Sequence, residues 1–122
     1  MQNQHLVAVV DDDESFRIAL VDSLSSVGYD ACGYASADEF IAAAADTTCH
    51  CVITDIHMPG MNGFELKQHL ASRASAMPVI MITARTEPDL ESKAAAVGAV
   101  CLLRKPFATD ALVKCLDRVL NP

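Results

Sequence analysis

The chain has 122 residues, of which 52% are hydrophobic, 20% charged and 5% aromatic, so we expect one globular domain with a core of aliphatic side chains. Nine basic and sixteen acidic residues give a net charge of −7, which argues against binding nucleic acid through its phosphates. No apolar run is long enough to span a membrane, and residues 1–5 lack a signal-peptide pattern, so a cytoplasmic protein is expected.

The first part of the chain alternates between strand and helix patterns. The short apolar run 6–10 predicts a strand buried on both faces, and residues 29–34 predict a weaker strand. A helix that ends at Gly28 is expected between them. Its apolar residues recur at helical spacing and are Phe16, Ala19, Leu20, Leu24 and Val27.

The rest of the chain continues this alternation. Ser36 and Glu39 have the spacing of a capping box, which predicts a second helix through Ala45. Further strands are predicted over residues 51–54, 79–83 and 100–103. Helices are expected where apolar residues have helical spacing: Phe64, Leu66 and Leu70, then Leu90, Ala94 and Val97, then Leu112, Leu116, Val119 and Leu120. Five strands alternating with five helices predict an α/β fold, with a parallel sheet covered on both faces.

Polar residues follow the apolar runs at the positions where function collects in such sheets, namely the carboxyl ends of the strands. Three acidic residues follow the first run, and one acidic residue, one hydroxyl and one ammonium follow later runs: Asp11, Asp12, Asp13, Asp55, Thr83 and Lys105. Each is a weak signal alone, because acidic residues often cap helices and lysines are usually solvated. Together they predict a functional site at one edge of the sheet.

The chemistry that fits this set is phosphoryl transfer to a carboxylate. Clustered carboxylates repel each other unless a cation lies between them, and oxygen-only ligands suit Mg²⁺. A metal held by Asp12 and Asp55 would leave Asp55 as the nucleophile. Thr83 could donate a hydrogen bond to a phosphoryl oxygen, and Lys105 could pair with another.

Four stretches of the chain resemble the receiver domains of bacterial two-component response regulators, and nitrogen-fixation-type regulators in particular. These stretches are Val9–Glu14, Thr54–Gly63, Met81–Ala84 and Lys105–Phe107, in the family's order and spacing. The resemblance implies one receiver domain over residues 1–122. It also implies a flavodoxin-like, doubly wound (βα)5 fold with strand order 2-1-3-4-5.

The family's residue roles carry over to matching positions. Asp55 would be the phosphoacceptor, Asp12 a direct ligand of Mg²⁺, and Asp11 a ligand acting largely through water. His57 would offer its backbone carbonyl to the metal, without a need for its imidazole. Thr83 would be the switch hydroxyl, and Lys105 would pair with the phosphate before a cis peptide bond at Pro106. Asp13 is expected to cap the first helix instead.

The resemblance also implies partners and an output surface. The phosphoryl group would come from a sensor histidine kinase or a phosphotransfer protein, with no direct binding to nucleic acid or membrane. A downstream protein or a second copy would dock on the fourth helix, fifth strand and fifth helix, at a surface including Leu90, Glu91, Lys93, Arg104 and Ala111. Leu102 stands where the family usually has Tyr or Phe, so we expect output to run mainly through the Thr83 loop.

Two other functions remain open at this stage. A phosphatase with an aspartyl-phosphate intermediate would usually have a second Asp two residues after the nucleophile, where this chain has His57. A pseudo-receiver would usually lack part of the acidic set, which is complete here. The non-enzymatic receiver is therefore favoured.

The cysteines are odd in number and lie mostly in apolar surroundings: Cys32, Cys49, Cys51, Cys101 and Cys115. Reduced core thiols are expected, with Cys101 used for packing rather than redox sensing. The Cys49–Cys51 stretch with His50 between falls short of a structural zinc set, even if alternation on a strand places both sulfurs on one face.

Overall fold

The computed structural model describes residues 5–44, 49–73 and 77–120, which form five strands and five helices in strict alternation. The elements in chain order are β1 (Leu6–Val10), α1 (Glu14–Ser26), β2 (Asp30–Tyr34), α2 (Ala37–Ala44), β3 (Cys51–Asp55), α3 (Gly63–Ser72), β4 (Val79–Thr83), α4 (Leu90–Ala96), β5 (Cys101–Arg104) and α5 (Thr109–Leu120). None of the described helices is both long and apolar enough to cross a membrane.

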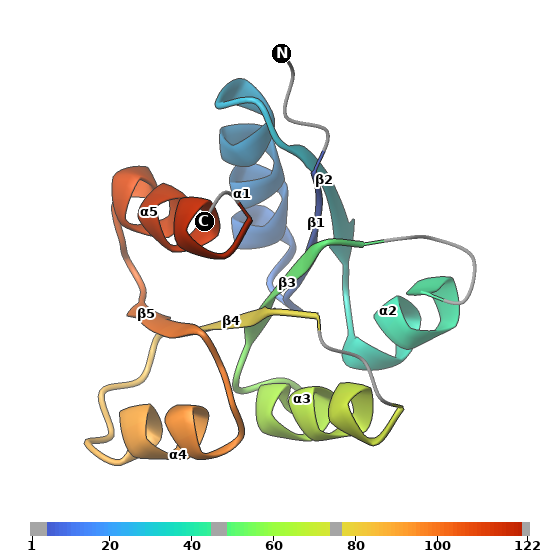
Figure 1. Cartoon of the computed structure of the whole chain (residues 1–122), viewed down its shortest axis with the longest axis vertical. Helices are drawn as coiled ribbons and strands as arrows, with labels where there is room; N and C mark the ends of the chain where they lie inside the picture. Colours follow the sequence, from blue (N-terminus) through green and yellow to red (C-terminus); the bar gives the residue numbers. More distant parts are fainter. Residues whose placement is uncertain (1–4, 45–48, 74–76, 121–122) are drawn as a thin grey trace.

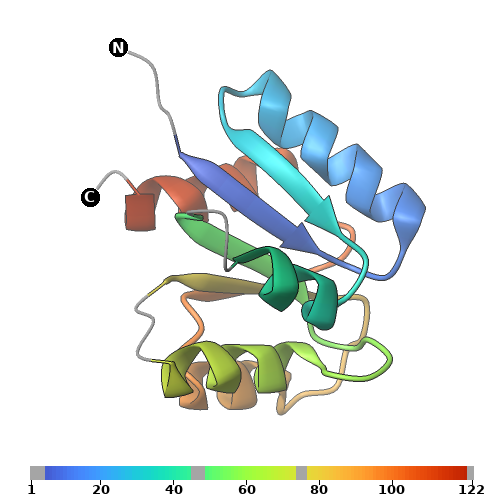
Figure 2. The ribbon, with the colours of Figure 1, turned by 90° about the vertical axis from the view of Figure 1, so that its right-hand side faces the viewer.

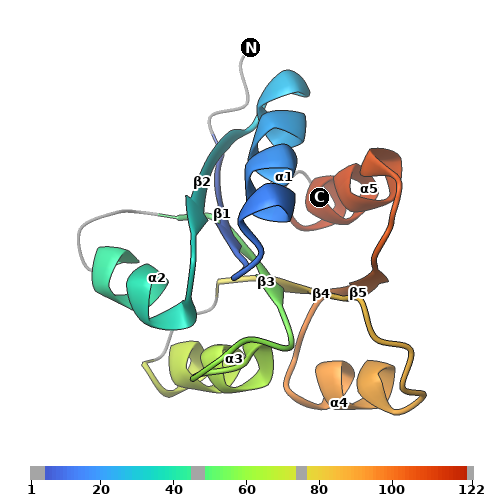
Figure 3. The same cartoon turned by 180° about the vertical axis from the view of Figure 1, so that it is seen from behind.

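The strands form one parallel sheet in the order β2-β1-β3-β4-β5, as the sequence resemblance implied. Helices α1 and α5 lie on one face of this sheet, and α2, α3 and α4 lie on the other (Figure 1, and from behind in Figure 3). Figure 2 shows β1 and β2 pointing in the same direction. Because all five strands are parallel, the loops that follow them meet at one edge, which we call the carboxyl edge.

Each face of the sheet is covered by its own hydrophobic core. The α2–α4 core comprises Ala8, Val10, Ala37, Phe40, Val52, Ile56, Met58, Leu66, Leu70, Val79, Met81, Leu90 and Ala94. The α1–α5 core comprises Val7, Val9, Leu20, Leu24, Tyr29, Cys51, Ile53, Ile80, Ile82, Leu112, Cys115 and Leu116. Alternate residues of each central strand enter opposite cores, which explains why these strands read as continuous apolar runs.

The helix signals in the sequence are confirmed in part. Ser36 Oγ accepts a hydrogen bond from the Glu39 N–H at 3.1 Å, but the Glu39 carboxylate accepts from the N–H of Ala35, so the reciprocal capping box is not formed there. The expected helix end at Ala45 lies outside the described residues. In α1, only Leu20 and Leu24 are buried, while Ala19, and Val27 just after the helix, are exposed, because the stripe of α1 that meets the sheet is narrow.

The cysteine prediction is wrong for two of the five residues. Cys101 and Cys115 form a disulfide between β5 and α5, because the rotation of α5 over the sheet brings the two sulfurs together. Cys32, Cys49 and Cys51 are free. The other three cysteines therefore fit the expectation of reduced thiols, although Cys32 is exposed rather than part of the core.

Candidate functional site

Strand register brings the predicted residues together at the carboxyl edge. Val10 pairs with Thr54 and Thr83 pairs with Arg104, so the last residues of β3 and β4 lie close to the residues that follow β1 and β5. Four of the predicted side chains are delivered in this way: Asp11 after β1, Asp55 at the end of β3, Thr83 at the end of β4 and Lys105 after β5. Asp11, Asp55 and Thr83 are buried.

Lys105 joins the two buried carboxylates. Its Nζ atom lies 2.9 Å from Oδ2 of Asp11 and 2.9 Å from Oδ2 of Asp55. The remaining carboxylate oxygens also have donors, since Asp11 Oδ1 accepts from the Asp13 N–H and Asp55 Oδ1 accepts from the His57 N–H, both at 2.9 Å. The two acids are thus fixed in orientation as well as in position.

The charges of this cluster alter its titration. Burial is the main cause that raises the pKa of Asp11, and the nearby charge of Asp55 adds to it, against the hydrogen bonds from Asp13 and Lys105. Burial opposes the charge of Lys105, but its hydrogen bonds and ion pairs with the two carboxylates outweigh burial and raise its pKa. The Lys105 ammonium also lies 4.0 Å from the centre of the Phe16 ring. A charged lysine is therefore favoured here.

Asp12 completes a group that fits a hard cation. Carboxylate oxygens of Asp11, Asp12 and Asp55 lie within 4.8 Å of one another, with Asp12 exposed to solvent. Three carboxylates in this arrangement are the ligand type that Mg²⁺ accepts, and the exposed side leaves room for the waters that it keeps. The role of the His57 carbonyl as a further ligand stays a prediction.

The imidazole of His57 makes a contact that the sequence reasoning missed. Its Nδ1 atom lies 3.3 Å from Oγ1 of Thr83, and the same Oγ1 accepts a hydrogen bond from the Arg85 N–H at 3.0 Å. His57 comes shortly after β3 and Thr83 ends the neighbouring strand β4, so their positions at the ends of adjacent strands were the signal that the sequence offered. The Thr83 hydroxyl is therefore already engaged by His57 and Arg85.

Local backbone features hold Asp55 and the first helix in place. Asp13 caps α1 by accepting from the Phe16 N–H at 3.1 Å, as expected. A full capping box, which the sequence reasoning overlooked, joins Asn62 and Glu65 at the start of α3. Next to it, a Cβ on Gly63 would lie 2.7 Å from the backbone oxygen of Asp55. The expected cis peptide bond joins Lys105 to Pro106.

The Cys49–Cys51 stretch does not gather metal ligands. His50 Nδ1 accepts a hydrogen bond from the Leu6 N–H at 3.0 Å. Cys49 packs against the α2–α4 core, whereas Cys51 belongs to the α1–α5 core, so the expected placement on one face is wrong because Cys49 precedes the regular strand. Among residues 5–44, 49–73 and 77–120, three or more metal-binding side chains converge only at Asp11, Asp12 and Asp55.

The predicted docking surface needs one correction. Leu90 is 1% exposed and belongs to the α2–α4 core, because the first turn of α4 faces the sheet. Glu91 and Lys93 are exposed, while Arg104 and Ala111 are partly exposed. Arg104 Nη2 lies 3.4 Å from Glu91 Oε1, which links β5 to α4 across this surface.

Comparisons with known proteins identify what the chain is similar to. The family model described as the response regulator receiver domain matches residues 7–117. The chain is 35% identical over 116 residues to the DNA-binding transcriptional regulator NtrC of Salmonella typhimurium, covering 95% of this chain and 25% of that protein. It is 31% identical over 115 residues to the transcriptional regulatory protein FixJ of Bradyrhizobium diazoefficiens, covering 94% and 56%. The expected likeness to nitrogen-regulator receivers is confirmed.

A solved structure supports the same likeness. The chemotaxis protein CheY4 of Vibrio cholerae superposes with a TM-score of 0.88 at 33% identity, covering 97% of this chain and 100% of that chain. The two curated relatives are longer, and this chain spans about a quarter of one and about half of the other.

Proposed function

This chain belongs to the family of response regulator receiver domains, and from this premise we propose that residues 1–122 form a single receiver domain in which Asp55 accepts a phosphoryl group. The observation that carries the proposal is the bridge from Lys105 to the carboxylates of Asp11 and Asp55, at 2.9 Å each. It supports the proposal because a carboxylate oxygen, a group of three acids and a fixed ammonium lie together at one point of the carboxyl edge.

The transfer balances as a simple substitution at phosphorus. A carboxylate oxygen of Asp55 attacks the phosphorus of a phosphohistidine on a sensor kinase or a phosphotransfer protein. A P–O bond forms, the P–N bond breaks, and the histidine nitrogen leaves with its electron pair. Mg²⁺ held by Asp11, Asp12 and Asp55, with the backbone carbonyl of His57, would supply positive charge for the phosphoryl oxygens.

Lys105 and Thr83 then respond to the new charge. A phosphoaspartate carries about −1.5 to −2 charges and three strong acceptor oxygens. The Lys105 ammonium, already beside Asp55, pairs with one of these oxygens. The Thr83 hydroxyl, which lies 3.3 Å from His57 Nδ1, would leave this contact to donate to another of these oxygens. Phosphorylation is thereby coupled to the loop after β4.

Receiver domains are signalling domains, and we propose a signalling role in the cytoplasm rather than turnover of a small-molecule substrate. The output surface lies on α4, β5 and α5 and includes Glu91, Lys93, Arg104 and Ala111. A downstream protein or a second copy of the domain would dock there. Neither nucleic acid nor membrane is expected to bind this domain directly, in keeping with the net charge of −7.

Incubation with acetyl phosphate and Mg²⁺ tests the proposal. We expect phosphate to be incorporated into the chain, to be lost in Asp55→Asn and to be reduced in Asp12→Asn. Asp38→Asn, which changes an exposed acid on α2, is the matched control and should behave like the parent. Rapid release of free phosphate without labelled protein would favour a phosphatase, and no reaction at all would favour a pseudo-receiver. Undiminished labelling of Asp55→Asn would overturn the assignment.

A further inference from the structure

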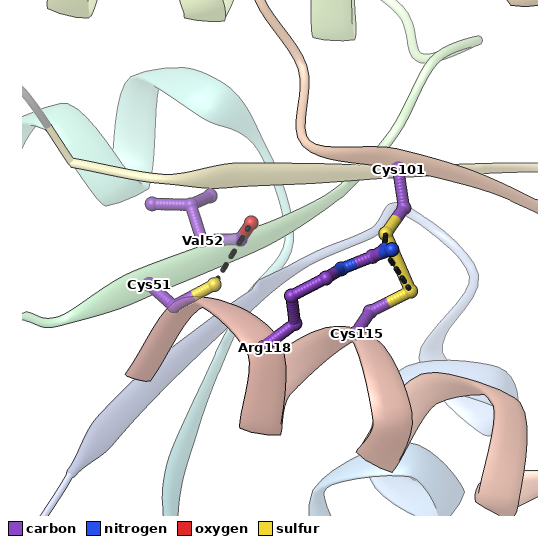
Figure 4. Close-up of a disulfide and its surroundings, with 5 residues drawn as sticks. All are labelled: Cys51, Val52, Cys101, Cys115 and Arg118. Carbon is purple, nitrogen blue, oxygen red and sulfur yellow. Dashed lines mark hydrogen bonds between the residues drawn. A yellow bond between two sulfur atoms is a disulfide. The ribbon is translucent and has the colours of Figure 1, made fainter. Parts of the chain in front are cut away.

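A disulfide lies on the face of the sheet opposite α4, away from the acidic site. Cys101 is the first residue of β5, and Cys115 lies in the middle of α5, with their Cα atoms 6.8 Å apart. Figure 4 shows Arg118, one turn further along α5, pointing its guanidinium at the pair. Its Nη2 atom lies 3.0 Å from Sγ of Cys101 and 3.9 Å from Sγ of Cys115.

The two cysteines differ in a way that assigns them different roles. Cys101 is partly exposed and is closer to Arg118, whereas Cys115 is 7% exposed and belongs to the α1–α5 core. A thiolate is the reactive form of cysteine, and a neighbouring guanidinium favours it. Cys101 therefore has both the access and the charge that a first-attacking sulfur needs, and Cys115 is placed to resolve the product.

The neighbouring core thiol has the opposite environment. Cys51 is 0% exposed, and burial raises the pKa of its thiol to about 12. Its sulfur is hydrogen-bonded only to the backbone oxygen of Val52, at 3.9 Å, among the contacts described (Figure 4). Cys51 is thus an unreactive thiol and does not compete with Cys101 for pairing with Cys115.

We propose that Cys101 and Cys115 form a redox-modification site, in which a hydroperoxide converts the two thiols into the disulfide and a thiol reductant reverses it. Disulfides in the reducing cytoplasm, the location proposed above, are usually transient and serve in catalysis or redox sensing. Because β5 leads directly to Lys105, the bond fixes α5 against the strand that positions this lysine. The chemistry at the two sulfurs does not depend on phosphorylation of Asp55.

The oxidation proceeds in two balanced steps. The Cys101 thiolate attacks one oxygen of the hydroperoxide, so that an S–O bond forms, the O–O bond breaks, and the second oxygen leaves as water or an alcohol after taking a proton. The Cys115 sulfur then attacks the sulfenic acid on Cys101, forms the S–S bond and expels hydroxide, which becomes water. Two thiols lose two electrons in total, and these reduce the hydroperoxide.

The test uses the full chain, reduced with dithiothreitol, desalted and titrated with hydrogen peroxide. Remaining thiols are alkylated under denaturing conditions and the chain is digested with trypsin. Because Lys93, Arg104, Lys114 and Arg118 flank the two cysteines, the disulfide joins peptides 94–104 and 115–118. We expect this linked pair in the monomer, loss of both thiols in step, continued alkylation of Cys51, and full recovery of both thiols after dithiothreitol.

Variants separate the proposed roles. In Cys115→Ser, dimedone should trap a sulfenic acid on Cys101. Arg118→Ala should slow oxidation about threefold, because an adjacent charge raises the thiolate fraction about tenfold and the lower nucleophilicity cancels about half of that gain on a logarithmic scale. Arg118→Lys should retain the parent rate, and Lys114→Ala, which removes a nearby exposed cation on the same helix, is the matched control.

Two results would overturn the proposal. One is persistence of both thiols while the exposed Cys32 is consumed. The other is equal oxidation rates in the parent and Arg118→Ala. If Cys115→Ser does not fold, the linked peptides of the parent chain still decide between the outcomes. Asp55→Asn should oxidise like the parent, so a failure of the phosphorylation proposal would leave this result unchanged.

Discussion

The Nζ atom of Lys105 lies 2.9 Å from Oδ2 of Asp55 and at the same distance from Oδ2 of Asp11. One ammonium group therefore offsets two buried carboxylates. A divalent cation can take over part of this neutralisation, because the same two carboxylates and Asp12 form the acidic pocket. The lysine and the metal are thus expected to support the same cluster from different sides.

Removing the lysine should make stability depend on the metal. We expect Lys105→Ala to lower the free energy of unfolding by about 2 kcal/mol without divalent ions, since a buried carboxylate pair loses its partner at a site with partial solvent access. Saturating Mg²⁺ should restore most of that loss. Urea unfolding, monitored by circular dichroism in EDTA and again in Mg²⁺, measures the free energy of unfolding under both conditions.

Lys93→Ala is the matched control for this experiment. Lys93 pairs with Asp89 at 3.2 Å on the exposed surface of α4, and exposed pairs of this kind contribute less than about 1 kcal/mol. The decrease in the free energy of unfolding of Lys93→Ala should be small and independent of Mg²⁺. A destabilisation of Lys105→Ala that is the same with and without Mg²⁺ would contradict the shared support of the carboxylates.

The contact between His57 and Thr83 predicts a gain of function. Because Thr83 would leave its contact with His57 Nδ1 to reach a phosphoryl oxygen, His57→Ala should bind beryllofluoride with Mg²⁺ about 2- to 13-fold more tightly, the range set by one hydrogen bond of about 0.5–1.5 kcal/mol. Isothermal titration calorimetry measures the affinity. His50→Ala, whose imidazole accepts from Leu6 N–H at the other end of β1, should bind like the parent.

Gly63 is predicted to be a positioning residue for Asp55, the proposed phosphoacceptor. A Cβ at this position would lie 2.7 Å from the backbone oxygen of Asp55 and 3.0 Å from Cα of Ile56, and neither backbone atom can move without displacing the end of β3. Gly63→Ala should lower stability by about 1–3 kcal/mol and slow labelling by acetyl phosphate.

Gly33→Ala provides the comparison. There the new Cβ would meet Cγ of Arg17 at 2.9 Å, and this side chain, although its Nη1 donates to the Asp11 carbonyl at 2.8 Å, can shift at lower cost than the backbone of β3. The variant should be destabilised less than Gly63→Ala and be labelled faster than Gly63→Ala. Equal labelling of Gly63→Ala and the parent would show that Asp55 tolerates the shift.

The four side chains that meet at the carboxyl edge were predictable from the sequence, because their positions follow from where each apolar run ends. Asp11, Asp55, Thr83 and Lys105 meet whenever parallel strands are in register, whatever the packing of the helices. The contacts that the sequence did not predict depend on helix rotation and side-chain direction. The disulfide between Cys101 and Cys115 requires the observed rotation of α5, which residue spacing does not encode.

The buried tyrosine predicts how stability changes in alkali. Burial, together with the hydrogen bond that the Tyr29 hydroxyl donates to Asp117 at 3.1 Å, raises the pKa of Tyr29 from its ordinary value of 10.0 to about 12. The unfolded chain therefore loses this proton first. The stability associated with Tyr29 is complete below pH 10 and is lost as the pH rises from 10 to about 12.

Tyr29→Phe tests this prediction. The variant should lose less stability than the parent across that pH window, as measured by urea unfolding at several pH values. Lys105 contributes a parallel loss at alkaline pH in both proteins, since its pKa is also raised. An identical pH dependence in the parent and Tyr29→Phe would contradict the assignment to Tyr29.

Leu102 stands at a position that is usually aromatic in the family. Its identity predicts how much this side chain contributes to changes at the proposed output surface. Its partly buried side chain packs against the α2–α4 core and borders a shallow groove of about 140 Å³ that is lined also by Glu91, Ala94, Ala95, Ala99, Val100 and Cys101. Leucine has neither a ring nor a hydroxyl to present in one state and withdraw in the other. A modification shifts an equilibrium only through its differential interaction with the two states, so this side chain should contribute little to the switch.

We therefore expect Leu102→Ala to keep the beryllofluoride-induced chemical-shift changes on α4, β5 and α5 in two-dimensional NMR spectra, at a cost of about 1–2 kcal/mol in stability for a partly buried leucine. Leu102→Tyr should enlarge those changes, because the alanine-lined groove can receive a ring that moves between two positions. The alternative is that the side chain of residue 102 packs against α4 in both states, whatever its identity. In that case Leu102→Tyr should leave the chemical-shift changes as they are in the parent. If the response collapses in Leu102→Ala, leucine itself carries the switch, and the route through the Thr83 loop is wrong.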